Sequence, residues 1–142
     1  MTQAHLYNWN SLPRETVRKG VERVGFRGDD TICVMNWLTP GMDTNPHQHD
    51  FEQLVVIVQG RVRFHVGDDV VEGGPGSMIR IPPHVMHYAE PVGDEVVLNL
   101  DIFSPCGRTT SIWSRIRRTN SHDRPARHRI GNACQKLPAA LA

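Results

Sequence analysis

Short segments rich in β-forming residues follow one another closely through residues 31–103, and they restrict the fold of this chain more than any other feature. Turn dipeptides separate the segments, among them Pro40-Gly41, Gln59-Gly60 and Gly67-Asp68. Residues 61–66 alternate polar and apolar side chains, which is typical of a strand with one wet face. No strong helical period competes with this pattern. The sequence therefore predicts an all-β fold, either an antiparallel sandwich or a small barrel.

The expected strands cover most of this region and are joined by short turns. A further edge strand is expected at 17–24, before the main series. The full set of expected strands is 17–24, 31–38, 47–58, 61–66, 70–72, 78–81, 85–90 and 96–103.

A potential metal-binding wall lies within residues 41–60. His47 and His49 stand two residues apart, and Gln53 follows four residues after His49. Side chains two residues apart in a strand point to the same side, so two imidazoles and an amide oxygen share one face. Imidazole is a common ligand of first-row metals, and a side-chain carbonyl can complete such a site. The remaining ligand should come from a paired strand, and His87 is the candidate.

Glu52 is the chemical competitor of Gln53, because a carboxylate is the stronger ligand. Its position in the alternation opposes that of His47 and His49 unless a bulge intervenes. We therefore expect Gln53 to be the ligand and Glu52 to be a solvated carboxylate or a partner of a ligand. Four neutral ligands would leave a divalent ion its full charge, which favours polarising a carbonyl or hydroxyl oxygen. Zn, Ni, Fe and Mn all accept such ligands, and oxygen chemistry on iron stays open.

Two spaced motifs in this chain resemble those of the cupins. The pattern G-x5-H-x-H-x3-[E/Q]-x6-G is matched at Gly41, His47, His49, Gln53 and Gly60. The second cupin motif is matched at Gly76, Pro82 and His87, with His84 where glycine is usual and Pro91 where asparagine is usual. The resemblance covers roughly residues 25–105. It implies a double-stranded β-helix of the jelly-roll type, one divalent transition metal, and pairing of two copies as a homodimer.

The segment Asp-x-Phe-Ser-Pro at 101–105 looks like the closing strand of cupins that linearise unsaturated uronates in pectin and alginate breakdown. In that family, an aspartate and an arginine near this strand serve the ring-opening step. Asp101 matches the aspartate, and Phe103 lies on the same side of the expected strand. Arg108 is the nearest arginine, one residue late. The resemblance therefore implies Asp101, Phe103 and Arg108 as catalytic residues and a small molecule as substrate.

Three functions follow from this set of residues. The first is a metal-dependent isomerase or lyase acting on a small sugar acid such as an unsaturated uronate. The second is an iron- or nickel-dependent dioxygenase. The third is a cupin that binds a small molecule without turning it over, and the fold alone does not separate them.

Length and charge limit the remaining classes of function. A chain of 142 residues forms one core, and a net charge of +1 implies no overall attraction to nucleic acid or membrane. The sequence has no signal-like segment and no apolar run long enough for a membrane span. Three widely spaced cysteines form no C-x-x-C pair, which makes a disulfide framework unexpected. We therefore expect a cytoplasmic protein.

The sequence divides into an N-terminal arm or edge strand at 1–30, a cupin barrel at 31–105 and a basic tail at 106–142. The tail carries seven arginines from residue 108 to residue 129 and loses all periodicity. One interpretation is that the tail is read in a shifted frame. The other is a genuine basic extension that is disordered or binds an acidic partner.

Overall fold

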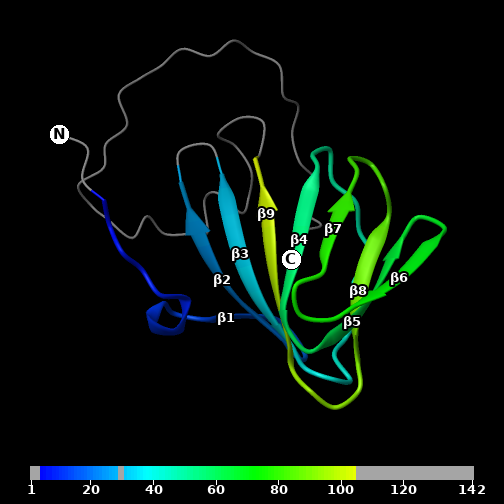
Figure 1. Ribbon diagram of the computed structural model, residues 1–142, viewed down its shortest axis with the longest axis horizontal. Coiled ribbons are helices and arrows are strands. Elements are labelled where there is room, and N and C mark those ends of the chain that lie inside the picture. The colour runs from blue at the N-terminus through cyan, green and yellow to red at the C-terminus, as the bar shows by residue number, and fades with distance from the viewer. Residues whose placement is uncertain (1–3, 29–30, 105–142) are drawn as a thin grey trace, which may run out of the picture.

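The computed structural model describes residues 4–28 and 31–104, and this part of the chain is built almost entirely from strands (Figure 1). A single 3-10 turn, η1 (Trp9–Ser11), precedes the strands. They are β1 (Glu15–Arg18), β2 (Val21–Arg27), β3 (Ile32–Leu38), β4 (Gln53–Gln59), β5 (Arg61–Val66), β6 (Asp69–Gly73), β7 (Met78–Ile81), β8 (His87–Val92) and β9 (Val97–Phe103).

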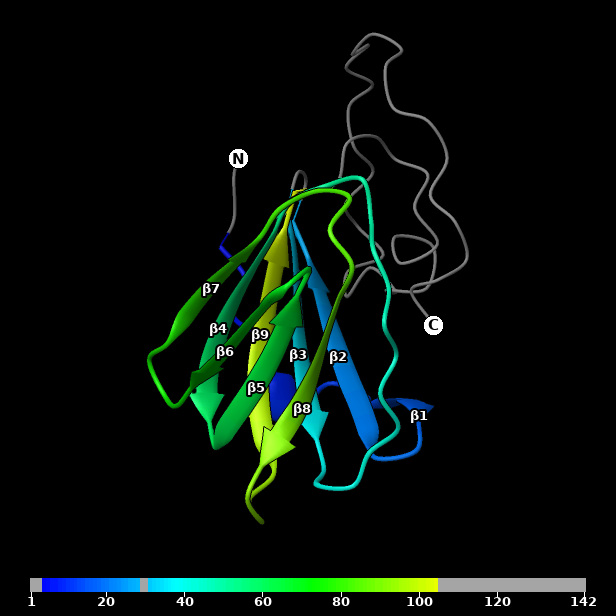
Figure 2. The same cartoon turned by 90° about the vertical axis from the view of Figure 1, so that its right-hand side faces the viewer.

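The strands form two antiparallel sheets. The larger has the order β1-β2-β3-β9-β4-β7 and the smaller the order β6-β5-β8. Figure 2 shows the smaller sheet lying in front of the larger one, so the two sheets face each other as the walls of a barrel. Strand β9, the last in the chain, lies between β3 and β4 at the centre of the larger sheet. The all-β, antiparallel architecture expected from the sequence is confirmed.

The main core fills the space between the two sheets. Alternate residues of each strand point into it, as the two-residue period of a strand requires. The fully or almost fully buried members are Val21, Leu38, Val55, Ile57, Val62, Phe64, Ile81 and Val97.

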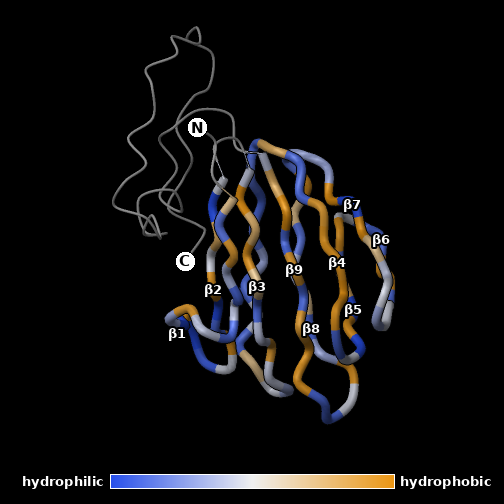
Figure 3. The backbone as a smooth tube through the Cα atoms, turned by 60° about the vertical axis from the view of Figure 1, so that its left-hand side comes forward, coloured by the Kyte–Doolittle hydropathy of each residue, from blue (hydrophilic) through white to orange (hydrophobic). Residues whose placement is uncertain are grey.

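A second apolar cluster covers part of the outer face of the larger sheet. Val24, Met35 and Trp37 are buried there, and Leu12 from the N-terminal segment packs against them. The guanidinium carbon of Arg14 lies 3.9 Å from the centre of the Trp37 ring, close enough for a cation–π contact. Figure 3 follows the alternation of polar and apolar residues along these strands. The N-terminal segment is therefore attached to the outside of the barrel.

Two expected strands differ by more than two residues from those observed. The segment 17–24 is divided between β1 and β2 by a turn at Lys19 and Gly20. Gly20 has a φ of 76°, and a Cβ atom there would lie 2.7 Å from the Cβ of Met42, so the turn requires glycine.

The expected strand at 47–58 is wrong for its first six residues. Regular pairing begins only at Gln53, and His47 forms an isolated bridge with His87. Pro46 has no N–H to donate to a neighbouring strand, and the chain bends at Asp50 and Phe51, so no ladder is established before β4.

Arg108 and the whole basic tail lie outside the described residues, and so do Cys106 and Cys134. Within residues 4–28 and 31–104, no helix has the length and apolar character needed to cross a membrane.

Candidate metal centre

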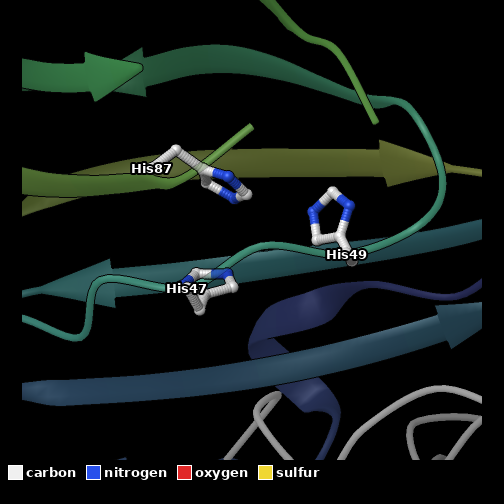
Figure 4. Close-up of side chains that lie close together, drawn as sticks. All are labelled: His47, His49 and His87. Atoms are coloured by element: carbon white, nitrogen blue, oxygen red, sulfur yellow. The ribbon is translucent and has the colours of Figure 1, made fainter. Parts of the chain in front are cut away.

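Three histidines from two segments converge inside the barrel (Figure 4). His47 and His87 exchange backbone hydrogen bonds of 3.1 and 2.8 Å, which places their rings 4.4 Å apart between centres. The His49 ring lies 4.9 Å from that of His87. One nitrogen from each of the three imidazoles lies within 4.8 Å of the other two. The three histidines could therefore hold a single metal ion.

Hydrogen bonds to the backbone determine which nitrogen of each ring faces the centre. The Nδ1 atoms of His47, His49 and His87 lie 2.7, 2.7 and 2.8 Å from the carbonyl oxygens of residues 45, 51 and 85. A carbonyl oxygen only accepts, so each Nδ1 carries the hydrogen and donates it. Each Nε2 then keeps a lone pair, which is the arrangement of a metal-binding histidine.

Two of these lone pairs face no hydrogen-bond donor. The Nε2 atom of His87 is buried and has no hydrogen-bond partner. The Nε2 atom of His49 lies 2.9 Å from the Oε1 atom of Gln53, and both atoms are acceptors in this arrangement. Buried acceptors that face one another are costly unless a positive charge lies between them. The residues present therefore fit a divalent cation held by three nitrogens and one oxygen.

Burial lowers the pKa of two of the three imidazoles, those of His47 and His87. It lowers the pKa of His87 to about 4, and the neighbouring His47 and His49 act in the same direction. Burial also lowers the pKa of His47, helped by His49 and by the positive charge of Arg18. Both shifts favour the neutral imidazole, which is the form that binds metals.

Gln53 and Glu52 lie on opposite sides of the barrel wall. The Gln53 residue is 7% exposed and faces the imidazoles from the start of β4. Glu52 points outward and pairs with Arg80 of β7. The amide oxygen, and not the carboxylate, is therefore the group that the structure brings to the histidines.

Asp101 of β9 lies on the inner side of the barrel, next to this cluster. Its carboxylate accepts hydrogen bonds from the Nδ2 atoms of Asn36 and Asn99, at 2.8 and 2.7 Å, and another from Gln53. Burial raises the pKa of Asp101 to about 7, although these three donors oppose the change. The side chain is therefore able to give or take a proton near neutral pH.

Phe103 supports the cluster through a neighbouring ring. Its ring lies 5.2 Å from that of Phe51, which stacks on His49 at 4.2 Å with an angle of 5° between the rings. Both phenylalanines line the same cavity, which has a volume of about 120 Å³ and contains all three histidines, Gln53 and Asp101. The sequence-predicted ligands, Asp101 and Phe103 therefore share one site, whereas Arg108 is outside the described residues.

The model of the AraC-like ligand binding domain matches residues 31–138, about three quarters of the chain. The chain belongs to this family. Its fold is the cupin fold, as the resemblance of the two motifs implied. The structure of KdgF from Halomonas sp. superposes with a TM-score of 0.66 over 74% of this chain and 96% of that chain, at 24% identity.

Two further relatives carry the names of different enzymes, a dioxygenase and an isomerase. Acireductone dioxygenase of Bacillus pumilus (strain SAFR-032) is 30% identical over 103 residues, which is 65% of this chain and 56% of the relative. H2HPP isomerase of Bacillus subtilis is 30% identical over 84 residues, 58% of this chain and 36% of the relative. This chain thus spans about half, or less, of the length of these two relatives.

His84 takes the place of a glycine in the second cupin motif, and the backbone explains why glycine is usual there. His84 has a φ of 62°, in the left-handed region that glycine adopts without strain. Its N–H donates a 2.7 Å hydrogen bond to the carbonyl oxygen of His49, so this turn helps to hold a ligand-bearing segment. The side chain itself is exposed and is not part of the cluster.

Two arginines that line the cavity of this cupin were not predicted as functional residues. Arg18 from β1 and Arg23 from β2 line it together with the histidines. The only signal was the mixture of basic and apolar residues in the segment 17–24, which predicted an edge strand without a functional role.

Proposed function

We propose that this cupin is a metal-dependent isomerase or lyase that acts on a small sugar acid, such as an unsaturated uronate. One observation carries the proposal: the Gln53 side chain joins the Asp101 carboxylate to the histidine cluster. Its amide hydrogen-bonds to Asp101, and its Oε1 atom lies 2.9 Å from Nε2 of His49. A proton-transferring group and a Lewis-acid site therefore border the same 120 Å³ cavity.

His47, His49, His87 and Gln53 would hold a divalent ion, with Zn, Ni, Fe and Mn all compatible with this set. When bound, such an ion would supply Lewis acidity, which would polarise a substrate carbonyl or hydroxyl oxygen and acidify the neighbouring C–H or O–H group. Asp101 takes this proton and returns it to another atom of the same substrate. Asn36, on the neighbouring strand β3, and Asn99, on β9 itself, hold the Asp101 oxygens in place. Phe51 and Phe103 exclude water from one side of the reacting group.

The comparisons support this class of reaction without defining the substrate. A relative is named as an isomerase, and the motif with Asp101 and Phe103 resembles that of cupins that linearise uronates. The likeness to the KdgF structure supports the fold alone, because the two sequences are only 24% identical.

A dioxygenase is the second candidate, because a relative named as an acireductone dioxygenase matches 65% of this chain. Histidine-rich sites of this kind also bind iron that reacts with oxygen. A module that binds its ligand without turnover is the third candidate, and the description of the matching family as a ligand binding domain favours it.

The deciding experiment compares metal forms and one variant. Metal-free protein is loaded with zinc, nickel, manganese or iron(II) and incubated with an unsaturated uronate, and loss of the substrate double bond is followed by its ultraviolet absorbance. We expect turnover with a redox-inactive ion and no oxygen consumption. Asp101→Asn should lower kcat by about 10²- to 10⁴-fold with unchanged metal content, because it removes the proton-transferring group. Glu52→Gln, on the outer side of the same wall, is the matched control.

Two results would contradict the proposal. Oxygen consumption that requires iron(II) would identify a dioxygenase. Binding of the uronate without turnover in any metal form would identify a binding module.

A further inference from the structure

A β-bulge directs Arg18 into the cavity. In the β1–β2 pair, Thr16 lies opposite Glu22 but Arg18 lies opposite Val21, so β1 advances two residues while β2 advances one. Successive residues of a regular strand point to opposite faces. Val17 and Arg18 nevertheless both line the cavity, because the extra residue rotates the end of the strand. Without the bulge, the strand alternation would place these two side chains on opposite faces.

Contacts on both sides hold Arg18 in this position. Its Nε atom donates a 2.7 Å hydrogen bond to the carbonyl oxygen of Asp43. The N–H of Asp43 donates in turn to the carbonyl oxygen of Lys19, at 3.1 Å, and the N–H of Thr39 donates to that of Gly20, at 2.8 Å. The turn after β1 is thereby joined to the loop that precedes the histidines. Among the hydrogen bonds of the described residues, Arg18 is held through Nε alone, so its two Nη groups remain to donate to a ligand from a pre-organised position.

The charge of Arg18 is poorly compensated. Burial lowers its pKa, and the positive charge of Arg23 acts in the same direction, while Asp43 offers a partial offset. Arg23 lines the same cavity and bonds through Nε to the Glu15 carboxylate at 2.9 Å. Among the residues that the structure describes, no carboxylate lies within ion-pair distance of Arg18. A half-buried cation beside a second cation favours an anionic ligand.

Arg18 is also close to the histidine cluster. Its charge contributes to the lowered pKa of His47, and both residues line the cavity. An anion held by Arg18 would therefore lie near the three histidines. Asp101 lines the same cavity from β9, which is three strands from β1 in the order β1-β2-β3-β9.

We propose that Arg18 is the specificity-determining residue of this site and binds the carboxylate of an acidic substrate through its two Nη groups. Arg23 adds positive charge to the same wall. The acid end of the substrate then lies toward β1, and its reacting end lies toward the histidines and Asp101. The inference rests on the proposed function for the identity of its ligand as a small sugar acid, and it adds the residue that selects the acid.

The experiment measures binding and needs no turnover. The probes are D-glucuronate and D-glucuronamide, which differ in the carboxylate alone. Their affinities are measured by isothermal titration calorimetry on metal-free protein and on zinc-loaded protein, since zinc can also attract a carboxylate. We expect wild type to prefer glucuronate by about 10- to 100-fold in both forms, as charge-assisted hydrogen bonds allow.

Three variants locate the source of this preference. Arg18→Gln should abolish it, and Arg18→Lys should keep part of it, because lysine retains the charge without the paired donors. Arg61→Gln is the matched control: it removes the same charge from β5, where the Arg61 side chain is 64% exposed, and should leave the preference unchanged. Thermal melting shows whether each variant is folded. If Arg18→Gln does not fold, Arg18→Lys still tests the inference.

Equal affinity of wild type for the two probes would overturn the inference, and so would an undiminished preference in folded Arg18→Gln and Arg18→Lys. These outcomes are separate from failure of the proposed function. A preference that depends on Arg18 in a protein without turnover would support the inference and reject the enzyme. Turnover of a uronate with the same KM in wild type and Arg18→Gln would reject the inference alone.

Discussion

The barrel interior has an apolar end and a polar end, and the same strands contribute to both. Strand β9 begins with Val97, which is 0% exposed, and continues to Asn99 and Asp101 on the same face. Strand β4 runs in the opposite sense, from Gln53 to Ile57, which is 1% exposed. The contrast shows how a small barrel separates stability from chemistry. The apolar residues of each strand pack in the core, and this packing fixes the position of the polar residues on the same strand.

The two ends differ in what burial does to the free energy of unfolding. Each large apolar side chain in the core contributes on the order of 1.5–3 kcal/mol by leaving water. An acceptor such as Nε2 of His87, buried without a partner, costs about 1–3 kcal/mol. Burial at the apolar end therefore offsets the free-energy cost of burial at the polar end, and a bound cation would remove part of that cost.

The strongest test of this contrast is His87→Ala at the polar end. Loss of one of three imidazoles should reduce the metal content from about one ion per chain to almost none, and lower metal affinity by more than about 100-fold, because even partners of ligands contribute up to that amount. The measurement is elemental analysis after dialysis, with metal-free protein checked for folding by circular dichroism. His65→Ala is the matched control, since His65 bonds to Glu90 outside the cluster. Equal metal retention in both variants would contradict the assignment.

The corresponding change at the apolar end is Ile57→Ala. Ile57 is fully enclosed, so the variant should lose about 2–5 kcal/mol of unfolding free energy in urea denaturation of the metal-free protein. Metal stoichiometry at low temperature should stay at the wild-type value. Val58→Ala, on the neighbouring residue that is 40% exposed, should cost far less. A loss of metal in folded Ile57→Ala would show that the two ends are not separable.

The smallest expected effect concerns the turn that leads from β7 to β8. His84→Gly should raise the unfolding free energy by about 1 kcal/mol, because glycine adopts a φ of 62° without the strain of a side chain. Thermal and urea unfolding of metal-free protein measure the change, and metal content should not alter. His84→Ala retains the strain and serves as the control. Destabilisation by glycine would mean that the imidazole makes a contribution of its own.

Much of the polar end was predictable from local spacing. The alternation of side chains placed His47, His49 and Gln53 on one face and Glu52 on the other, and the structure has them so even where regular pairing is missing. Side chains two residues apart point to the same side where the chain is extended, paired or not, and the bend at Asp50 and Phe51 leaves Gln53 facing the same cavity as His47 and His49. The glycine position taken by His84 was likewise visible in the motif.

Other features depended on pairing between distant segments. Asn36 reaches Asp101 across 65 residues of sequence, and the burial that raises the pKa of Asp101 comes from the packing of the whole barrel, so neither has a local signal. The bulge at Arg18 is a property of the register between β1 and β2, and its role in the cavity depends on the loop that contains Asp43.

The sequence by itself determined the strand alternation, the turns and the ligand types, because these follow from the conformational preferences of neighbouring residues. Only the tertiary structure decided which polar groups meet, which of them are buried and which arginines face the histidines. Burial and charge act between residues that are close in space, and the order of strands in the two sheets establishes that closeness.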